Sequence, residues 1–200
     1  MVKRLTWATL LSLGLTTSAC GSNMKTPDIT QNPHPTQRYE ITLTIHGAPR
    51  GFDEATGYMQ YAIGNSTACT PRRPISGVYE TMDQHPPITF TRVDDKTYKS
   101  TVVTDYYVDA DYFGLGVCHW QMTAVVAMLK INGNTVELSP DIEVEDITAQ
   151  KSVDQYFPIS SLSSEDKLSY AAPGIPLSSV KPEYRHEFFY ITMAAKKVTP

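Results

Sequence analysis

The sequence predicts an all-β protein: a single antiparallel β-sandwich with one disulfide, preceded by a signal peptide and a flexible tether. Three observations support this fold class. Apolar and polar residues alternate from Tyr39 to His46, which is the period of a half-buried strand. The longest apolar stretch, from Val117 to Ile131, is apolar on both alternating faces, as expected of a covered central strand. No segment shows sustained helical periodicity, and turn-forming residues separate the short apolar runs.

The first residues have the composition of an export signal. A basic pair, Lys3-Arg4, precedes the apolar run Leu5–Leu15, which is shorter than the roughly 20 residues of a membrane-spanning helix. The tetrapeptide Thr17-Ser18-Ala19-Cys20 resembles a lipobox, in which small residues precede a cysteine that receives lipid. We therefore expect residues 1–19 to be a lipoprotein signal peptide and Cys20 to carry the lipid. The alternative is an ordinary secretory signal that leaves Cys20 as a free thiol, which is a liability in an oxidising compartment.

The residues after the expected lipid site predict where the protein lies. Gly21 rather than Asp follows Cys20, which favours the outer membrane over retention in the inner membrane. The segment from Gly21 to Arg38 is rich in proline and polar residues and has few apolar ones, which predicts an extended tether. We expect a protein anchored by lipid at the periplasmic face of the outer membrane, with residues 20–38 as lipidated cysteine and tether. Residues 39–200 would then form one folded domain.

Further strands are expected along this domain, with turn signals between them. In chain order they are Gly57–Ile63, Ile88–Val93, Thr97–Val103, Val117–Ile131, a returning segment at Thr135–Leu138, and Tyr184–Val198. Asp94-Asp95-Lys96 predicts a hairpin turn between the second and third of these strands. Residues 64–77 form a loop rich in proline and glycine, residues 141–147 alternate acidic and apolar residues, and Ser152–Pro182 is expected to be irregular.

The cysteine count predicts one disulfide. The chain has three cysteines, and lipid attachment would use Cys20. Cys69 and Cys118 then remain as one pair in an oxidising compartment, where we expect them to be bonded. Two buried free thiols are the alternative. A disulfide that closes a loop of this length contributes about 4 kcal/mol in the chain-entropy model.

Composition and motifs argue against several classes of function. Loss of Lys3 and Arg4 with the signal lowers Lys+Arg from 17 to 15 against 21 acidic residues, so the formal net charge falls from −4 to −6. An acidic domain without a basic stripe argues against nucleic-acid binding and is compatible with a basic protein partner. The sequence has no Gly-x-Ser-x-Gly elbow, no glycine-rich phosphate loop, and five scattered histidines. We therefore expect no enzymatic activity, metal or cofactor; His119 is interpreted as a structural or edge histidine rather than a ligand or acid–base group.

The segment from Asp105 to Trp120 is the most distinctive stretch, because carboxylates and aromatic residues precede two glycines and a cysteine. Clustered carboxylates are typical of calcium loops, although the spacing here is not that of an EF-hand. A second interpretation is a recognition loop, in which tyrosines supply rigid contact area and aspartates supply charge. A third is a structural corner with its aromatics packed inward. The residues that would contact a partner under the second interpretation are Asp105, Tyr106, Tyr107, Asp109, Asp111 and Tyr112.

The chain also resembles a known group of proteins. Residues 111–120, Asp-Tyr-Phe-Gly-Leu-Gly-Val-Cys-His-Trp, carry the resemblance together with Ile41-Thr42-Leu43-Thr44-Ile45-His46 and Leu138-Ser139-Pro140. The group consists of proteobacterial lipoproteins associated with type VI secretion loci, encoded next to lipase-type effectors. The resemblance covers Tyr39 to about Pro140. It implies an immunity protein that binds a phospholipase toxin in the periplasm and blocks it.

Other functions remain open on the sequence alone. A structural envelope lipoprotein, or one that binds a small envelope ligand without catalysis, would have the same features. A hydrolase is the weakest alternative, because no nucleophile constellation is present. A lipase-type gene next to this one would separate immunity from the other binding roles.

Overall fold

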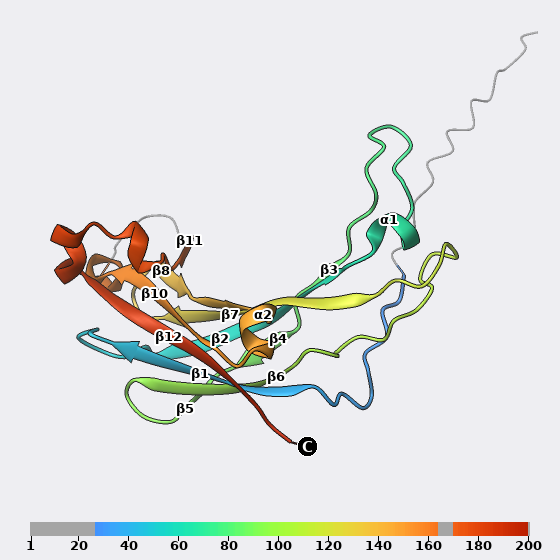
Figure 1. Ribbon diagram of the computed structural model, residues 1–200. Helices are drawn as coiled ribbons and strands as arrows, with labels where there is room; N and C mark the ends of the chain where they lie inside the picture. The colour runs from blue at the N-terminus through green and yellow to red at the C-terminus, as the bar shows by residue number, and fades with distance from the viewer. Residues whose placement is uncertain (1–26, 164–169, 200) are drawn as a thin grey trace, which may run out of the picture.

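The computed structural model describes residues 27–163 and 170–199, which form two packed β-sheets (Figure 1). Of these described residues, 47% lie in strands and 14% in helices, and neither sheet closes on itself, so the predicted β-sandwich is confirmed. The expected signal peptide 1–19, Cys20 and the first part of the tether lie outside the described residues. Within the described ranges, no helix has the length and apolar character to cross a bilayer.

The five-stranded sheet has the order β10-β12-β1-β6-β5 and the seven-stranded sheet the order β11-β8-β7-β2-β3. The strands of the first are β10 (Ser152–Pro158), β12 (Phe188–Lys197), β1 (Arg38–His46), β6 (Thr97–Val103) and β5 (Thr91–Arg92). Those of the second are β11 (Tyr170–Pro173), β8 (Val136–Ser139), β7 (Trp120–Lys130), β2 (Glu54–Ile63) and β3 (Asp83–Gln84), with β4 (Pro87–Thr89) on β2 and β9 (Asp141–Glu143) on β7. Of the strand pairs in the described ranges, β11 with β8 is parallel and the others are antiparallel.

Short helices connect some of these strands. They are α1 (Ser66–Cys69) and α2 (Val144–Thr148), and the 3-10 helices η1 (Ile159–Ser163), η2 (Leu177–Ser179) and η3 (Pro182–Glu187). The helix α2 follows β9 directly and packs against β7 and β12, so it closes one side of the sandwich. The alternating segment 141–147 is therefore a short strand followed by a helical turn.

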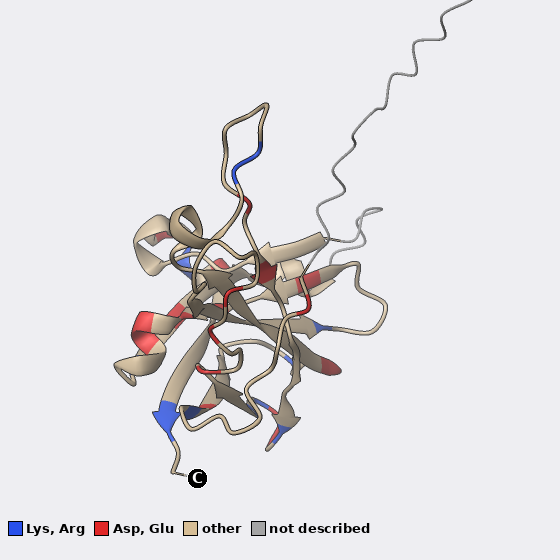
Figure 2. Ribbon diagram, turned by 90° about the vertical axis from the view of Figure 1, so that its right-hand side faces the viewer, with Lys and Arg blue, Asp and Glu red and all other residues tan. Residues whose placement is uncertain are grey.

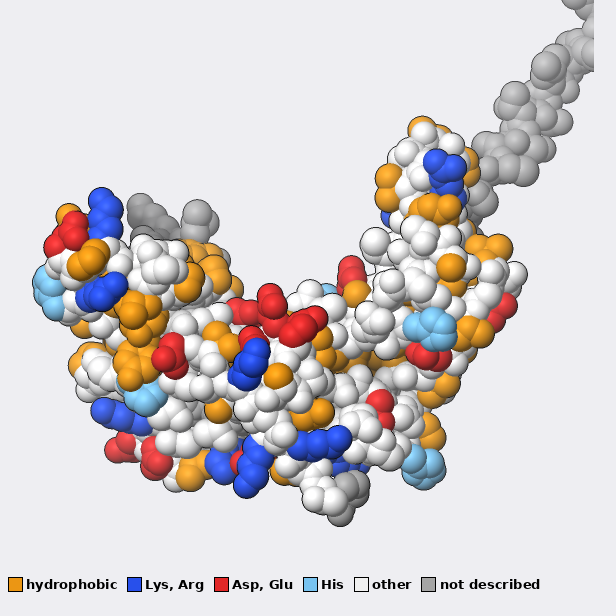
Figure 3. Space-filling model, in the orientation of Figure 1, with side chains coloured by type: hydrophobic (Ala, Val, Ile, Leu, Met, Phe, Trp, Pro, Cys, Tyr) orange, Lys and Arg blue, Asp and Glu red, His pale blue; other side chains and the backbone are white. Residues whose placement is uncertain are grey.

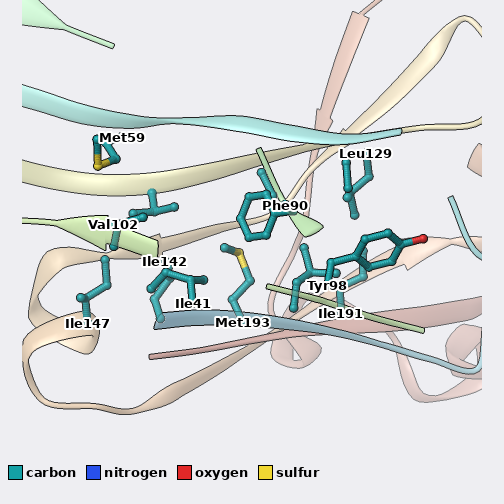
Figure 4. Packing of buried hydrophobic residues seen from close by; sticks show 14 of the residues in the cluster. Ile41, Met59, Phe90, Tyr98, Val102, Leu129, Ile142, Ile147, Ile191 and Met193 are labelled. Carbon is teal, nitrogen blue, oxygen red and sulfur yellow. The ribbon is translucent and has the colours of Figure 1, made fainter. Parts of the chain in front are cut away.

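The core lies between the sheets because each strand turns one set of alternate side chains inward. In β1 the odd positions, from Tyr39 to Ile45, are buried, as the alternation predicted. Figure 4 shows Ile41 of β1 and Met193 of β12 pointing toward Met59 of β2 and Leu129 of β7. Each such aliphatic side chain contributes about 1.5–3 kcal/mol on burial, so this layer supplies most of the stabilisation.

The strand β7 lies in the middle of its sheet, as expected, but the reason for its apolar residues on both faces is different. It begins at Trp120 rather than Val117. The register with β2 pairs Gln60 with Ala124 and Tyr61 with Met122, so Thr123 is an extra residue in a β-bulge. The bulge moves the core-facing set from even positions before it to odd positions after it. The expectation of a strand covered on both faces is therefore wrong; the core-facing side changes along the strand.

Two other strand assignments are corrected. The expected strand Ile88–Val93 is two short strands in different sheets: β4 pairs with β2, and β5 pairs with β6. Phe90 lies between them and is buried, so the chain crosses the core at this residue. The expected hairpin around residues 94–96 is confirmed by the antiparallel pairing of β5 with β6.

The C-terminal third of the chain departs further from the secondary structure that the sequence predicts. Residues 152–182 were expected to be irregular, yet they contain β10, an edge strand paired with β12. Gln155 obscures its alternation because it occupies a position where an apolar residue was expected; its side chain exchanges two hydrogen bonds with Asp141. The last strand begins at Phe188 rather than Tyr184, because residues 182–187 form η3.

The N-terminal boundary of the folded domain is also corrected. The tether was expected to reach Arg38, but residues 30–37 are hydrogen bonded to the segment 105–108 and Ile29 packs against the core. The backbone of Val108 donates to the carbonyl of Thr30 (3.0 Å), and that of Asn32 donates to the carbonyl of Tyr106 (2.7 Å). The folded domain therefore begins about ten residues before Tyr39.

Candidate interaction surface

The first carboxylate of the distinctive segment holds the N-terminal chain in place. Asp105 accepts hydrogen bonds from the backbone N–H groups of Thr36 (2.8 Å) and Gln37 (3.1 Å), and the Thr36 hydroxyl donates to it at 3.1 Å. Burial alone would raise the pKa of Asp105, but these hydrogen bonds favour the charged form and lower its pKa overall. Asp105 is thus a structural clamp between two segments that are far apart in the sequence.

The other two carboxylates also have partners inside the chain. Asp109 accepts from the backbone N–H of Trp120 (2.9 Å), and its second oxygen lies 2.7 Å from Nδ1 of the exposed His119. Asp111 accepts from the backbone N–H groups of Leu115 (3.0 Å) and Gly116 (3.2 Å), and these hydrogen bonds lower its pKa. The three carboxylates therefore face different backbone donors rather than one common point. Among the described residues no group of three or more His, Cys, Asp or Glu could hold a metal ion.

The aromatic residues of the segment pack against the core. Tyr107 contacts Tyr61 edge-on (5.2 Å between ring centroids), Tyr106 (4.9 Å) and Trp120 (5.0 Å). Tyr61 is fully buried, and its hydroxyl donates to the carbonyl of Val103. Tyr112 packs on Trp120 and donates to the carbonyl of Val108 at 2.5 Å. These contacts support the interpretation as a structural corner; a role of these residues in partner binding stays a prediction.

The clamp at Asp105 predicts a pH dependence of stability. Because the pKa of Asp105 is lowered by folding, its contribution is present above its unfolded pKa of about 3.9 and is lost as the pH falls through the folded value. Asp105→Asn should lower the free energy of unfolding at pH 7 by about 1–2 kcal/mol. The free energy of unfolding should also fall less between pH 7 and pH 3 in this variant than in the wild type. Urea unfolding at pH 7 and pH 3 measures both. Asp95→Asn, at a carboxylate that is 92% exposed, is the control and should change neither.

The disulfide joins this corner to a protruding hairpin. Cys69 and Cys118 are bonded, with their Cα atoms 5.3 Å apart, which confirms the predicted pairing. Both residues are fully buried. Cys69 ends α1, and the chain then leaves the sheet as the segment Thr70–Glu80, which we call the arm (Figure 1). Thr70 is buried at its base, and its hydroxyl lies 2.8 Å from the carbonyl of Glu80 on the opposite side.

The arm is internally bonded along its length. The backbone N–H of Arg73 donates to the carbonyl of Val78 (2.8 Å), and that of Gly77 donates to the carbonyl of Arg73 (2.9 Å). The Arg73 guanidinium makes two 2.8 Å bonds to the Glu80 carboxylate, and these bonds lower the pKa of Glu80. Gly77 has a φ of 68°, which lies in the left-handed region that residues other than glycine rarely adopt. The arm is therefore a preorganised hairpin.

Apolar side chains are exposed at the arm end of the molecule. Ile75 at the tip is fully exposed, and Val78 is 59% exposed. The neighbouring loop of residues 111–117, joined to the arm through the disulfide, exposes Leu115 and Val117. The basic residues of the arm are Arg72 and Arg73. Figure 2 shows the basic stretch between the base and the tip of the arm, and Figure 3 shows hydrophobic and basic side chains together on the arm. Exposed apolar groups gathered at one end are typical of a contact surface.

A second candidate surface lies between the arm and the opposite end of the molecule. The arm rises at one end and η2 and η3 at the other (Figure 1), and Figure 3 shows the surface hollowed between them. On the outer face of the seven-stranded sheet, the register places Tyr58, Val126 and Asp141 side by side, and Glu143 beside Ala124. We call the surface formed by Tyr58, Val126, Met128, Asp141 and Glu143 the hollow. Tyr58, Val126 and Met128 are half-buried, and Glu143 is exposed.

Two shallow depressions in the surface are weaker candidates for a binding site. One of about 230 Å³ lies over β6 and contains the ion pair of Lys99 with Glu40 (2.8 Å). The other, of about 210 Å³, lies beside the turn at residues 131–134. Neither combines an apolar interior with a few converging polar groups, the usual character of a small-molecule site.

The comparisons add no relative: no family model, curated protein or solved structure matches the chain. The candidate surfaces therefore rest on geometry. Sequence reasoning recognised the loop at residues 64–77 but missed the arm. Pro71, Pro74 and Gly77 around a lone Ile75 are the signal that could have indicated a tight, solvent-exposed hairpin.

Proposed function

We propose that the protein is a lipoprotein of the outer membrane, facing the periplasm, that binds and neutralises a lipase-type toxin of a type VI secretion system. It does so as a binding protein and not as an enzyme. The lipobox-like sequence ending at Cys20 and the resemblance around residues 111–120 support this role. The hollow is the single structural observation that carries it.

The hollow has the anatomy of a protein interface. Its middle offers half-buried apolar side chains, Tyr58, Val126 and Met128, and its border carries Asp141 and Glu143. The acidic border continues onto α2 with the exposed Glu145. An apolar centre with a charged rim is the usual arrangement where two proteins meet. A lipase must admit acyl chains through an apolar mouth, and a partner seated on that mouth excludes its substrate.

Co-expression tests the proposal. The lipase-type effector of the same locus, directed to the periplasm, should arrest growth alone and not together with this protein. The purified mature domain should bind the effector directly in a calorimetric titration. No measurable affinity together with no rescue of growth would refute the immunity function and favour a structural or ligand-binding envelope lipoprotein.

The acidic border predicts an effect on association. Glu143→Gln with Glu145→Gln should slow association with the toxin by about 5–10-fold at low salt, because charge complementarity steers the encounter, and added salt should remove the difference. Stopped-flow binding at two ionic strengths measures this. Asp94→Asn with Asp95→Asn, on the β5–β6 hairpin of the other sheet, removes the same charge and should leave the rate nearly unchanged. Equal slowing by both pairs would show that net charge acts, and would remove the hollow from the mechanism.

A further inference from the structure

The N-terminal chain enters the fold at the arm end. Residues 30–32 pair in antiparallel fashion with residues 106–108. Thr30 therefore lies beside Val108, and the chain before it points toward Ala110. Ala110 in turn pairs with Cys118, which is bonded to Cys69 at the base of the arm. Figure 1 shows the start of the described chain rising toward this same end. The described chain therefore starts, at residues 27–29, next to the arm.

The remaining chain is short. Pro27 is the first described residue, and seven Cα–Cα steps separate it from Cys20. A chain of that length spans at most about 25 Å. A lipid on Cys20 would therefore keep the arm end close to the bilayer. Five residues of extended chain carry the arm about 16 Å from its base to Ile75, a comparable distance.

The chemistry of the arm end fits a lipid surface. Ile75 is fully exposed at the tip, with Val78 on the same arm and Leu115 in the neighbouring loop also exposed. Arg73 is neutralised by Glu80, but Arg72 leaves the arm with a net positive charge. Aliphatic side chains beside a cation are the usual composition of segments that enter the headgroup region of an anionic membrane.

We propose that the tip of the arm is a second membrane contact, in which Ile75 enters the interface of the phospholipid bilayer and Arg72 lies among the headgroups. This inference rests on lipid attachment at Cys20 but does not involve the toxin. One isoleucine holds a free protein weakly. On an anchored domain the same contact is intramolecular, so a weak contact suffices. The arm then fixes the orientation of the domain on the membrane.

A fluorescent probe tests the contact. The lipidated full-length product, with Ile75→Cys carrying an environment-sensitive fluorophore, is reconstituted into vesicles of phosphatidylethanolamine and phosphatidylglycerol. We expect a blue-shifted emission and at least twofold quenching by spin-labelled lipid. Leu177→Cys, on η2 at the opposite end and 37% exposed, carries the control probe and should stay water-like. Equal, water-like emission from both positions would overturn the inference.

Further variants separate the contact from the anchor, and addition of the toxin separates it from the protein partner. Cys20→Ser should abolish membrane association; a serine variant that fractionates with the membrane like the wild type refutes the anchor. With the anchor intact, Ile75→Asp labelled at Val78→Cys should lose the quenching, whereas Leu177→Asp in the same background should retain it. If the emission of a probe at residue 75 is unchanged by vesicles but shifts on addition of the toxin, the membrane contact is overturned and the tip is assigned to the protein partner.

Discussion

Replacing Cys69 and Cys118 together by alanine should lower the free energy of unfolding by about 4 kcal/mol. The disulfide closes a loop of 49 residues, and opening it gives the unfolded chain back that much conformational entropy. Alanine is the appropriate replacement because both residues are fully buried and the new side chain must be apolar. The measurement is urea unfolding of the wild type and the double variant at pH 7.

The same change should loosen the base of the arm. Cys69 ends α1 immediately before Thr70, and Cys118 directly follows the 111–117 loop, so without the bond no cross-link holds the base of the arm to this loop. Amide exchange in the arm should accelerate more than exchange in β1, which lies in the other sheet. The wild type in a strong reductant is the control and should lose the same stability. A midpoint shift equivalent to less than 1 kcal/mol would contradict the entropic account.

Replacing Tyr61 by alanine should cost about 4 kcal/mol, because a large, fully buried side chain leaves a cavity under the aromatic corner. Tyr61→Phe should cost less, about 1–3 kcal/mol, since it keeps the ring but leaves the buried carbonyl of Val103 without its donor. Burial is also the largest cause that raises the pKa of Tyr61 above its ordinary value, so the hydroxyl stays a donor throughout the folded range. Thermal and urea unfolding measure both variants.

The matched control for this series is Tyr184→Ala on η3, where the tyrosine is 49% exposed and the expected change is within about 0.5 kcal/mol. If Tyr61→Ala proves as mild as Tyr184→Ala, the aromatic corner does not anchor the fold. The role of Tyr61 as the support of Tyr106, Tyr107 and Trp120 would then need revision.

Local pattern was sufficient for elements whose burial is regular along the strand. The alternation at Tyr39–Ile45 identified β1, and the parity of cysteines identified the Cys69–Cys118 bond; both are confirmed. The alternation of apolar and polar residues did not correctly describe strands in which a residue distant in sequence alters which side chains face the core. Thr123 forms a bulge against Gln60, and Gln155 replaces an apolar side chain by exchanging hydrogen bonds with Asp141. Neither partner is close in sequence, so neither effect was predictable from the strand itself.

Alternation and residue type act locally, so they were enough to establish the β character of the protein, its disulfide and its distinctive segment. The role of that segment became visible in the contacts that the folded chain makes. The carboxylate of Asp105 had to meet the backbone of Thr36, and that of Asp111 the backbone of Gly116, before their role as structural acceptors was visible. The exposure of Ile75 likewise depended on which neighbours the fold would bring to it, since a side chain is buried or left in water by packing partners far away in the chain.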